Sequence, residues 1–367
     1  MRSAAGCAAL GIILLLVAGT FDAEPFYVTG TALVLLGAGA AAWIAAGAWG
    51  VTVHRELSAR SVVEDEPLTL RVVAESGRLP LPPGYIDEPL LAEPAPLQAG
   101  RRSSRLRIQA SFGRRGRRVL EPVTLVLRDP LGLAERTVRA GEGDEVLVLP
   151  RLHPVQVAAS GGDDSTSHAR ALLTAAAETE LDGLRVHAEG APASRIHWPS
   201  LAKGGEIMER KLIAEADSRP IVVLDPRGAR SAEDLDAAVR AAGSLCVHFA
   251  KRTGCALLLP GDRRAVTIEP DLGGWPAAHV RLALLGDAAG PALAAVQNRR
   301  GLVVFVSARR ADRPPRGLGR TPGGQVLVVP GEADPARARR PVLSVAGCTG
   351  YLGARAGSGP ALEALAS

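Results

Sequence analysis

The 367-residue sequence predicts a membrane hairpin, a small all-β sandwich and then an α/β domain with a doubly wound, mainly parallel sheet. Three observations lead to this prediction. Two long segments near the amino terminus carry no charged side chain. The region after them consists of short runs of β-branched or alternating apolar residues, separated by turns rich in Pro and Gly. The second half alternates continuous apolar runs with helical apolar periodicity, which is typical of a parallel sheet.

Residues 1–50 are predicted to form two transmembrane helices. No charge occurs from Ala4 to Thr20 or from Phe26 to Gly50, and each stretch reaches about the 20 residues that cross a bilayer. The first stretch by itself could be a signal peptide. However, Arg2 makes a thin charged region, no small-residue cleavage site follows, and a second span begins directly after Pro25.

Charge predicts the orientation of this hairpin. The connecting loop is acidic, whereas Arg2, Arg55 and Arg60 flank the outer ends of the pair. The positive-inside rule then places both termini in the cytoplasm. We therefore expect a cell-membrane protein with two spans, whose soluble domains, after residue 50, are cytoplasmic.

Residues 51–157 are predicted to form the β-sandwich, and residues 158–179 a linker or mobile loop, because the latter are rich in Ala, Gly, Ser and Asp. No convincing helical periodicity occurs in the first of these regions. The expected strands are Val51–Val53, Leu68–Val73, Leu106–Ala110, Val119–Leu127 and Val146–Leu149.

Residues 180–330 are predicted to form the α/β domain, and the tail, residues 331–367, receives no assignment. The run Ile221–Asp225 is typical of a buried parallel strand, and Ala232–Arg252 has helical spacing with Gly254 placed to end the helix. The remaining expected strands are Ala256–Pro260, Arg264–Glu269, Gly301–Ser307 and Gln325–Val329, and the remaining expected helices are Trp275–Gly286 and Pro291–Arg300.

Composition argues against several functions. The net charge is +5, but the densest basic run, Arg114–Arg118, lacks the interleaved aromatics of a single-strand stacking surface, so no nucleic-acid partner is predicted. The four cysteines show no C-x-x-C spacing, which favours buried apolar thiols over zinc or disulfides. No Walker A pattern is present, so the chain is not itself predicted to be an ATPase.

A compact polar cluster opens the α/β region. It runs from Glu180 to Arg185 and from Arg195 to Trp198. We expect its arginines to pair with nearby acids and its Trp to pack beneath the sheet, and the second alternative is a surface for a protein partner. A hydrolase using Asp182 and His197 is a further alternative, although no dedicated catalytic spacing supports it. The candidate residues are Glu180, Asp182, Gly183, Arg185, Arg195, His197 and Trp198.

These segments carry a family resemblance. Together with Arg115-Gly116, Asp129–Leu133 and Val148–Arg151, in this order, they resemble the DUF58 family of membrane-anchored proteins, which have a von Willebrand factor A-like domain and are commonly encoded beside MoxR-type AAA+ ATPases. The resemblance implies such a domain in residues 180–330. The sequence departs from the family pattern at His187, Glu189–Ala191, Pro199 and Lys203.

The resemblance also implies a place for a metal-ion-dependent adhesion site, which starts with D-x-S-x-S at the end of the first strand. The equivalent stretch here runs from Asp225 to Ala229, with Arg227 and Ala229 at the two serine positions. Two hydroxyl ligands for Mg²⁺ are therefore missing, and a cationic side chain stands beside the remaining carboxylate. We predict a degenerate site, with no metal and no cofactor.

The resulting functional expectation is a non-enzymatic, membrane-anchored adaptor or scaffold. It would work with a MoxR-like AAA+ ATPase in envelope or complex assembly and would have no small-molecule substrate. A purely structural envelope component and the Asp182/His197 hydrolase are the alternatives.

Overall fold

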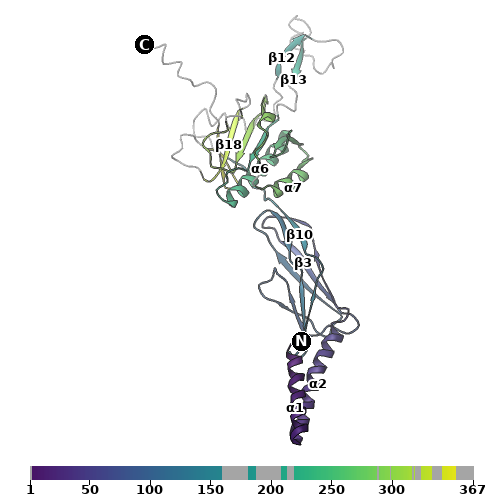
Figure 1. The fold of residues 1–367 in the computed structure, drawn as a ribbon. Helices are drawn as coiled ribbons and strands as arrows, with labels where there is room; N and C mark the ends of the chain where they lie inside the picture. Colours follow the sequence, from purple (N-terminus) through teal and green to yellow (C-terminus); the bar gives the residue numbers. More distant parts are fainter. Residues whose placement is uncertain are drawn as a thin grey trace. The chain divides into compact units, whose positions relative to one another are not determined.

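A computed structural model describes residues 2–158, 181–186, 208–212, 219–286, 289–297, 299–315, 318, 324–332 and 341–352. The chain forms two compact units (Figure 1). The first contains Met1–Gly113 and Arg117–Val148, and the second contains Arg114–Gly116 and Leu149–Ser367. Each is described by itself.

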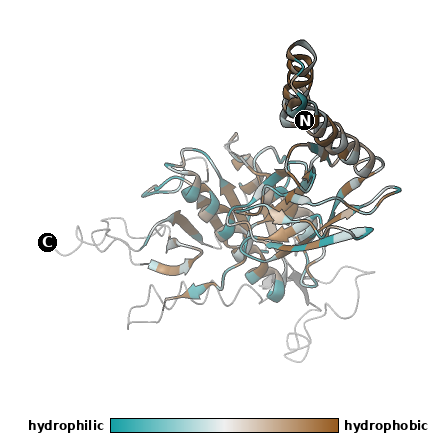
Figure 2. Cartoon of the chain, turned by 90° about the horizontal axis from the view of Figure 1, so that it is seen from below, coloured by the Kyte–Doolittle hydropathy of each residue, from teal (hydrophilic) through white to brown (hydrophobic). Residues whose placement is uncertain are grey.

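The first unit begins with two apolar helices, α1 (Arg2–Phe21) and α2 (Glu24–Gly47). Both are long and apolar enough to cross a membrane, and Figure 2 shows that they are predominantly hydrophobic. Small residues bring the two backbones together, because a Cβ added at Gly11 would lie 2.6 Å from the Gly30 carbonyl oxygen. The two predicted helices are thus confirmed.

The rest of the first unit is built from strands. One sheet has the order β1-β3-β6, a second β2-β10-β7 and a third β5-β4-β8-β9. Alternate residues of these strands point into one apolar core, which includes Leu70, Ile86, Leu125 and Val146. The bounds are β1 Thr52–Leu57, β2 Ser61–Val63, β3 Leu68–Glu75, β4 Gly84–Asp87, β5 Ala95–Pro96, β6 Ser103–Ala110, β7 Gly116–Leu120, β8 Thr124–Arg128, β9 Glu135–Arg139 and β10 Asp144–Leu149.

Arg55, which the sequence suggests as a positive flank of the membrane hairpin, lies inside this unit. Its guanidinium donates to both oxygens of Glu88, at 2.7 and 2.9 Å from Nη2, and to Asp144 at 3.1 Å. The Arg55 and Glu88 side chains are only 2% and 0% exposed. The charge of Arg55 is therefore neutralised by acids within the strand core and does not face a membrane surface.

The second unit contains an eight-stranded sheet in the order β11-β19-β20-β18-β17-β14-β15-β16. Strands β15, β14, β17 and β18 run parallel at its centre, whereas β16 on one side and β20, β19 and β11 on the other pair antiparallel. The sheet is therefore mixed, and less parallel than expected, because short antiparallel strands extend both edges. The bounds are β11 Gln156–Val157, β14 Ile221–Asp225, β15 Cys255–Leu258, β16 Val266–Ile268, β17 Val303–Ser307, β18 Gln325–Pro330, β19 Pro341–Val345 and β20 Cys348–Leu352.

Helices α6 (Ala232–Thr253) and α7 (Trp275–Leu284) pack on one face of this sheet. The Ser231 hydroxyl accepts from the Asp234 N–H to cap α6, and Gly254 ends it at φ +81° as expected. Among the described residues, Leu318 and the one-turn 3₁₀ helix η2 (Leu293–Val296) pack on the other face. The α-helix predicted over 291–300 is wrong in type, because in the described part of this range only Leu293–Val296 are helical, as a 3₁₀ turn.

Two sequence boundaries differ from those expected. Strand β11, inside the predicted sandwich, pairs with β19 of the second unit, and the unassigned tail supplies both β19 and β20. The candidate cluster contributes β12 (Leu181–Val186), which pairs antiparallel with β13 (Met208–Leu212) as a two-stranded sheet of its own. The predicted linker, residues 158–179, lies outside the described residues apart from Ala158.

Candidate functional site

The carboxyl ends of β14 and β17 form the most distinctive polar edge of the second unit. Asp225 and Ser307 are register partners there, and the Ala308 N–H donates to the Asp225 carbonyl at 2.9 Å. The connection after β14 leads to β15 on one side, whereas the one after β17 leads to β18 on the other. Adjacent strands whose connections diverge in this way leave a crevice that commonly binds ligands.

The Arg227 side chain binds the carboxylate of Asp225 at this edge. Its Nε donates to Oδ1 at 2.9 Å, its Nη2 to Oδ2 at 2.8 Å, and its backbone N–H to Oδ1 at 3.2 Å. The hydrogen bond and the charge of Asp225 both raise the pKa of the Arg227 guanidinium. A divalent ion would have to displace this two-pronged contact before it could reach either carboxylate oxygen.

The other positions of the degenerate motif do not restore a metal site. Ala229 packs against the apolar core. Among the residues that the structure describes, no group of three or more His, Cys, Asp or Glu side chains is placed to hold a metal ion. The chemistry of this edge is therefore that of a salt-bridged, cationic surface.

Two further arginines follow β17 at the same edge. Arg309 lies against Gly228, where an added Cβ would be 3.3 Å from its Cδ, and Arg310 approaches Asp234 at 4.0 Å. The side chains of Arg227 and Arg310 are 55% and 46% exposed, and Arg309 is exposed too. We call Arg227, Arg309 and Arg310 the arginine edge. Sequence reasoning missed the last two because only the β14–β17 pairing brings them beside Arg227.

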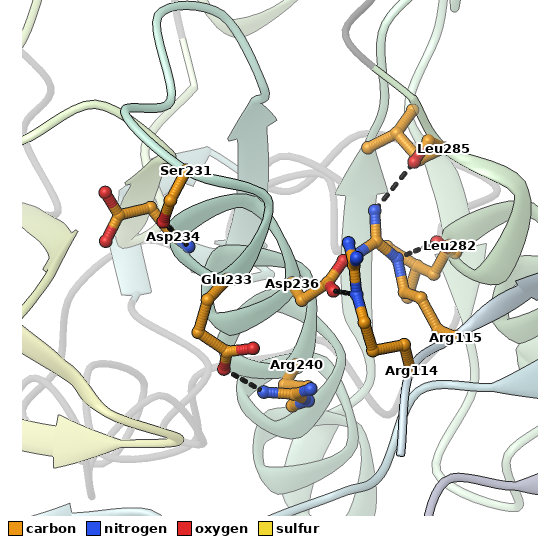
Figure 3. Close-up of polar contacts among 9 residues, drawn as sticks. All are labelled: Arg114, Arg115, Ser231, Glu233, Asp234, Asp236, Arg240, Leu282 and Leu285. Carbon is orange, nitrogen blue, oxygen red and sulfur yellow. Dashed lines mark hydrogen bonds and ion pairs between the residues drawn. The ribbon is translucent and has the colours of Figure 1, made fainter. Parts of the chain in front are cut away.

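The Arg115-Gly116 motif has a structural role within the second unit. Arg115 pairs with Asp236 of α6, and it donates to the Leu282 and Leu285 carbonyls at the end of α7, at 3.2 and 2.7 Å (Figure 3). Arg114 binds the other Asp236 oxygen at 3.0 Å. A buried guanidinium thus joins α6 to the carboxyl-terminal end of α7, where the Leu282 carbonyl also accepts from the Leu285 N–H at 3.4 Å.

The cluster that the sequence singles out is only partly described. Asp182 falls where the β12–β13 register shifts between Leu181 and Gly183, and Arg185 lies opposite Glu209. Glu180, Arg195, His197 and Trp198 lie outside the described residues. The expected pairing of the arginines with nearby acids therefore stays a prediction, and so does the alternative in which Asp182 acts with His197.

A cavity of about 770 Å³ lies beside β11, β19 and α6. Its lining includes Glu233 and Arg240, which pair with each other at 2.7 Å (Figure 3), and Cys348. Burial raises the pKa of Cys348 to about 12, so this thiol is not a nucleophile near neutral pH. We place no catalytic site there.

We expect Cys246, Cys255 and Cys348 to resist thiol reagents in the folded protein. All three are buried, and burial raises the pKa of Cys246 as well as that of Cys348. Maleimide labelling should stay negligible from pH 7 to pH 9, because this range lies below the Cys348 pKa, and should become complete in denaturant. Rapid labelling of any of the three in the folded Cys7→Ala protein would contradict their burial.

No family model matches the chain, and no curated protein is significantly similar to it in sequence.

Proposed function

We propose that this protein is a membrane-anchored adaptor of the DUF58 type, whose von Willebrand A-like second unit binds a MoxR-like AAA+ ATPase in envelope or complex assembly. The observation that carries the proposal is the Arg227–Asp225 contact. It neutralises the one acid of the motif and leaves a salt-bridged edge at the place where related folds use a metal.

The arginine edge favours an acidic partner surface. Arg227 and Arg310 approach Asp225 and Asp234, yet about half of each of these two arginine side chains remains exposed, and Arg309 is exposed as well. Guanidinium groups form planar, two-pronged hydrogen bonds to carboxylates, so such an edge suits acidic side chains of another protein. Opposite charges also speed association and set the register of a complex.

The membrane end of the first unit supports the proposed cytoplasmic placement. Trp49 follows α2 and is 73% exposed, and the guanidinium of Arg78 lies 6.0 Å from its ring centre. Arg101 and Arg102 lie on the segment that hydrogen-bonds to residues 76–81. Trp is enriched at both membrane interfaces, whereas basic side chains are enriched on the cytoplasmic side, so the arginines favour this placement. These arginines, and not the buried Arg55, supply the positive charge at this end of α2.

Reversing the charge of the arginine edge tests the adaptor role. We expect Arg227→Glu combined with Arg309→Glu and Arg310→Glu to weaken binding of the purified MoxR-like ATPase from the same genome at least about tenfold. Binding would be measured by interferometry with the full chain in nanodiscs. Lys251→Glu, an exposed reversal at the opposite end of α6, is the matched control. Equal losses in both variants, or no binding by the unaltered protein, would contradict the proposal.

Metal independence is a separate prediction. Because Arg227 occupies both Asp225 oxygens, we expect calorimetry with Mg²⁺ or Mn²⁺ to show no micromolar binding, and EDTA to leave ATPase binding unchanged. Asp225→Ala is the control. Micromolar binding of either ion that disappears in Asp225→Ala would show that the degenerate site still works.

A further inference from the structure

The turn between β8 and β9 lies against the membrane helix α2. A space of about 250 Å³ is lined on one side by Asp129, Pro130 and Leu131, and on the other by a stretch of α2. The α2 residues are Leu35, Leu36, Gly39, Ala40 and Trp43. All belong to the first compact unit.

This contact lies well inside the helix. Gly39 is eight residues before the end of α2 at Gly47, which corresponds to about 12 Å along the helix axis. The turn therefore lies beside the interior of α2 and not only at its carboxyl-terminal end. The proposed anchoring places this segment of α2 within the bilayer.

Three backbone N–H groups of the turn bond to Asp129 within the turn. The Asp129 carboxylate accepts from the N–H groups of Leu131, at 2.9 Å, and Ala134, at 2.5 Å. The Gly132 N–H donates to the Asp129 carbonyl at 3.0 Å, and Pro130 has no N–H to satisfy. Asp129 is only 4% exposed. Internal hydrogen bonds of this kind lower the cost of placing these N–H groups near lipid, where no water can serve as partner.

The outer surface of the turn is apolar. Leu131 is 62% exposed, and on the facing helix Trp43 is 56% and Leu35 66% exposed. These side chains gather at the β8–β9 turn and the adjoining part of α2. These exposed apolar side chains lie next to a membrane helix, so the acyl chains around that helix are suitable partners for them.

We propose that the Asp129–Leu133 turn is seated in the bilayer beside α2, with Leu131 among the phospholipid acyl chains. The proposal rests on the membrane anchoring given under Proposed function. It also accounts for the Asp-Pro-Leu-Gly-Leu motif: Asp129 holds the N–H groups, Pro130 removes one, Leu131 enters lipid, and Gly132 adopts φ +70°. The turn would fix the strand-rich part of the unit at a set height on the membrane.

Depth-dependent fluorescence quenching tests this placement. An environment-sensitive NBD probe would be attached to Leu131→Cys in the full Cys7→Ala chain, which is reconstituted in phosphatidylcholine–phosphatidylglycerol vesicles. Glu142→Cys is the matched control, because it is exposed and follows the opposite end of β9, about 17 Å along the strand. Leu36→Cys on α2 reports membrane insertion itself. The unsubstituted Cys7→Ala parent checks that the buried cysteines stay unlabelled.

We expect lipids with nitroxides on the acyl chain to quench the probe at 131 at least about threefold more than at 142, and an aqueous quencher to show the reverse. Strong acyl quenching at 36 with equal, weak quenching at 131 and 142 would overturn the seated turn and leave the anchoring intact. Weak acyl quenching at 36 would overturn the anchoring and, with it, this inference.

Discussion

Replacing Arg115 with Ala is expected to destabilise the second unit by about 3–5 kcal/mol, because it would leave Asp236 as a buried charge without its main partner. The Arg115 and Asp236 side chains are 3% and 5% exposed. The same change would also remove the donors to the Leu282 and Leu285 carbonyls at the end of α7. We expect urea unfolding of the full chain in detergent to show this loss, and hydrogen exchange to locate it in α6 and α7.

Arg114→Ala is the matched control. Arg114 binds the same carboxylate, but its side chain is 55% exposed, so water screens and replaces the interaction, and the expected loss is below about 1 kcal/mol. Equal losses of unfolding free energy in the two variants would mean that burial does not decide how much each contact contributes to stability.

Arg55→Ala is expected to destabilise the first unit by a similar amount, about 3–5 kcal/mol. Glu88 would remain fully buried without a cation, and the Glu121 carbonyl would lose a donor at 2.7 Å. These contacts link β1 to the residue that follows β4 and to the segment before β8, so their loss should open several strands together. Thermal unfolding of the full chain in detergent, with hydrogen exchange of β1 and β4, measures this effect.

The control for this prediction is Arg71→Ala. Arg71 pairs with Glu56 at 3.7 Å, and both side chains are more than half exposed, at 55% and 51%. The expected change is between 0 and about 1 kcal/mol. A large effect in Arg71→Ala, or a small one in Arg55→Ala, would contradict the assignment of Arg55 to the strand core.

Local patterns predicted most of the secondary structure. Uncharged segments predicted α1 and α2, the run Ile221–Asp225 predicted β14, and helical spacing that ends at Gly254 predicted α6. These succeed because each depends on the periodicity of burial or on a single capping residue, which a short window of sequence contains.

Only part of the candidate site could be predicted from the sequence. Asp225, Arg227 and Ala229 stood out only because the family resemblance implies an adhesion-site motif at the end of this strand. Arg309 and Arg310 carry no such signal, because they follow a different strand and join Arg227 only through the β14–β17 register. The basic run Arg114–Arg118 carries no sequence signal of a buried residue, yet the Arg115 side chain is buried and links two helices.

The sequence by itself determined the two apolar helices, the strand-rich region after them and the alternating helices and strands of the second half. Local hydrophobic patterns are sufficient to predict each of these. The tertiary structure decided the mixed direction of the large sheet, the buried partners of Arg55 and Arg115, and the contact of the β8–β9 turn with α2. Each of these joins residues far apart in the chain. Their energies depend on burial and hydrogen-bond geometry, which exist only once distant segments have packed together.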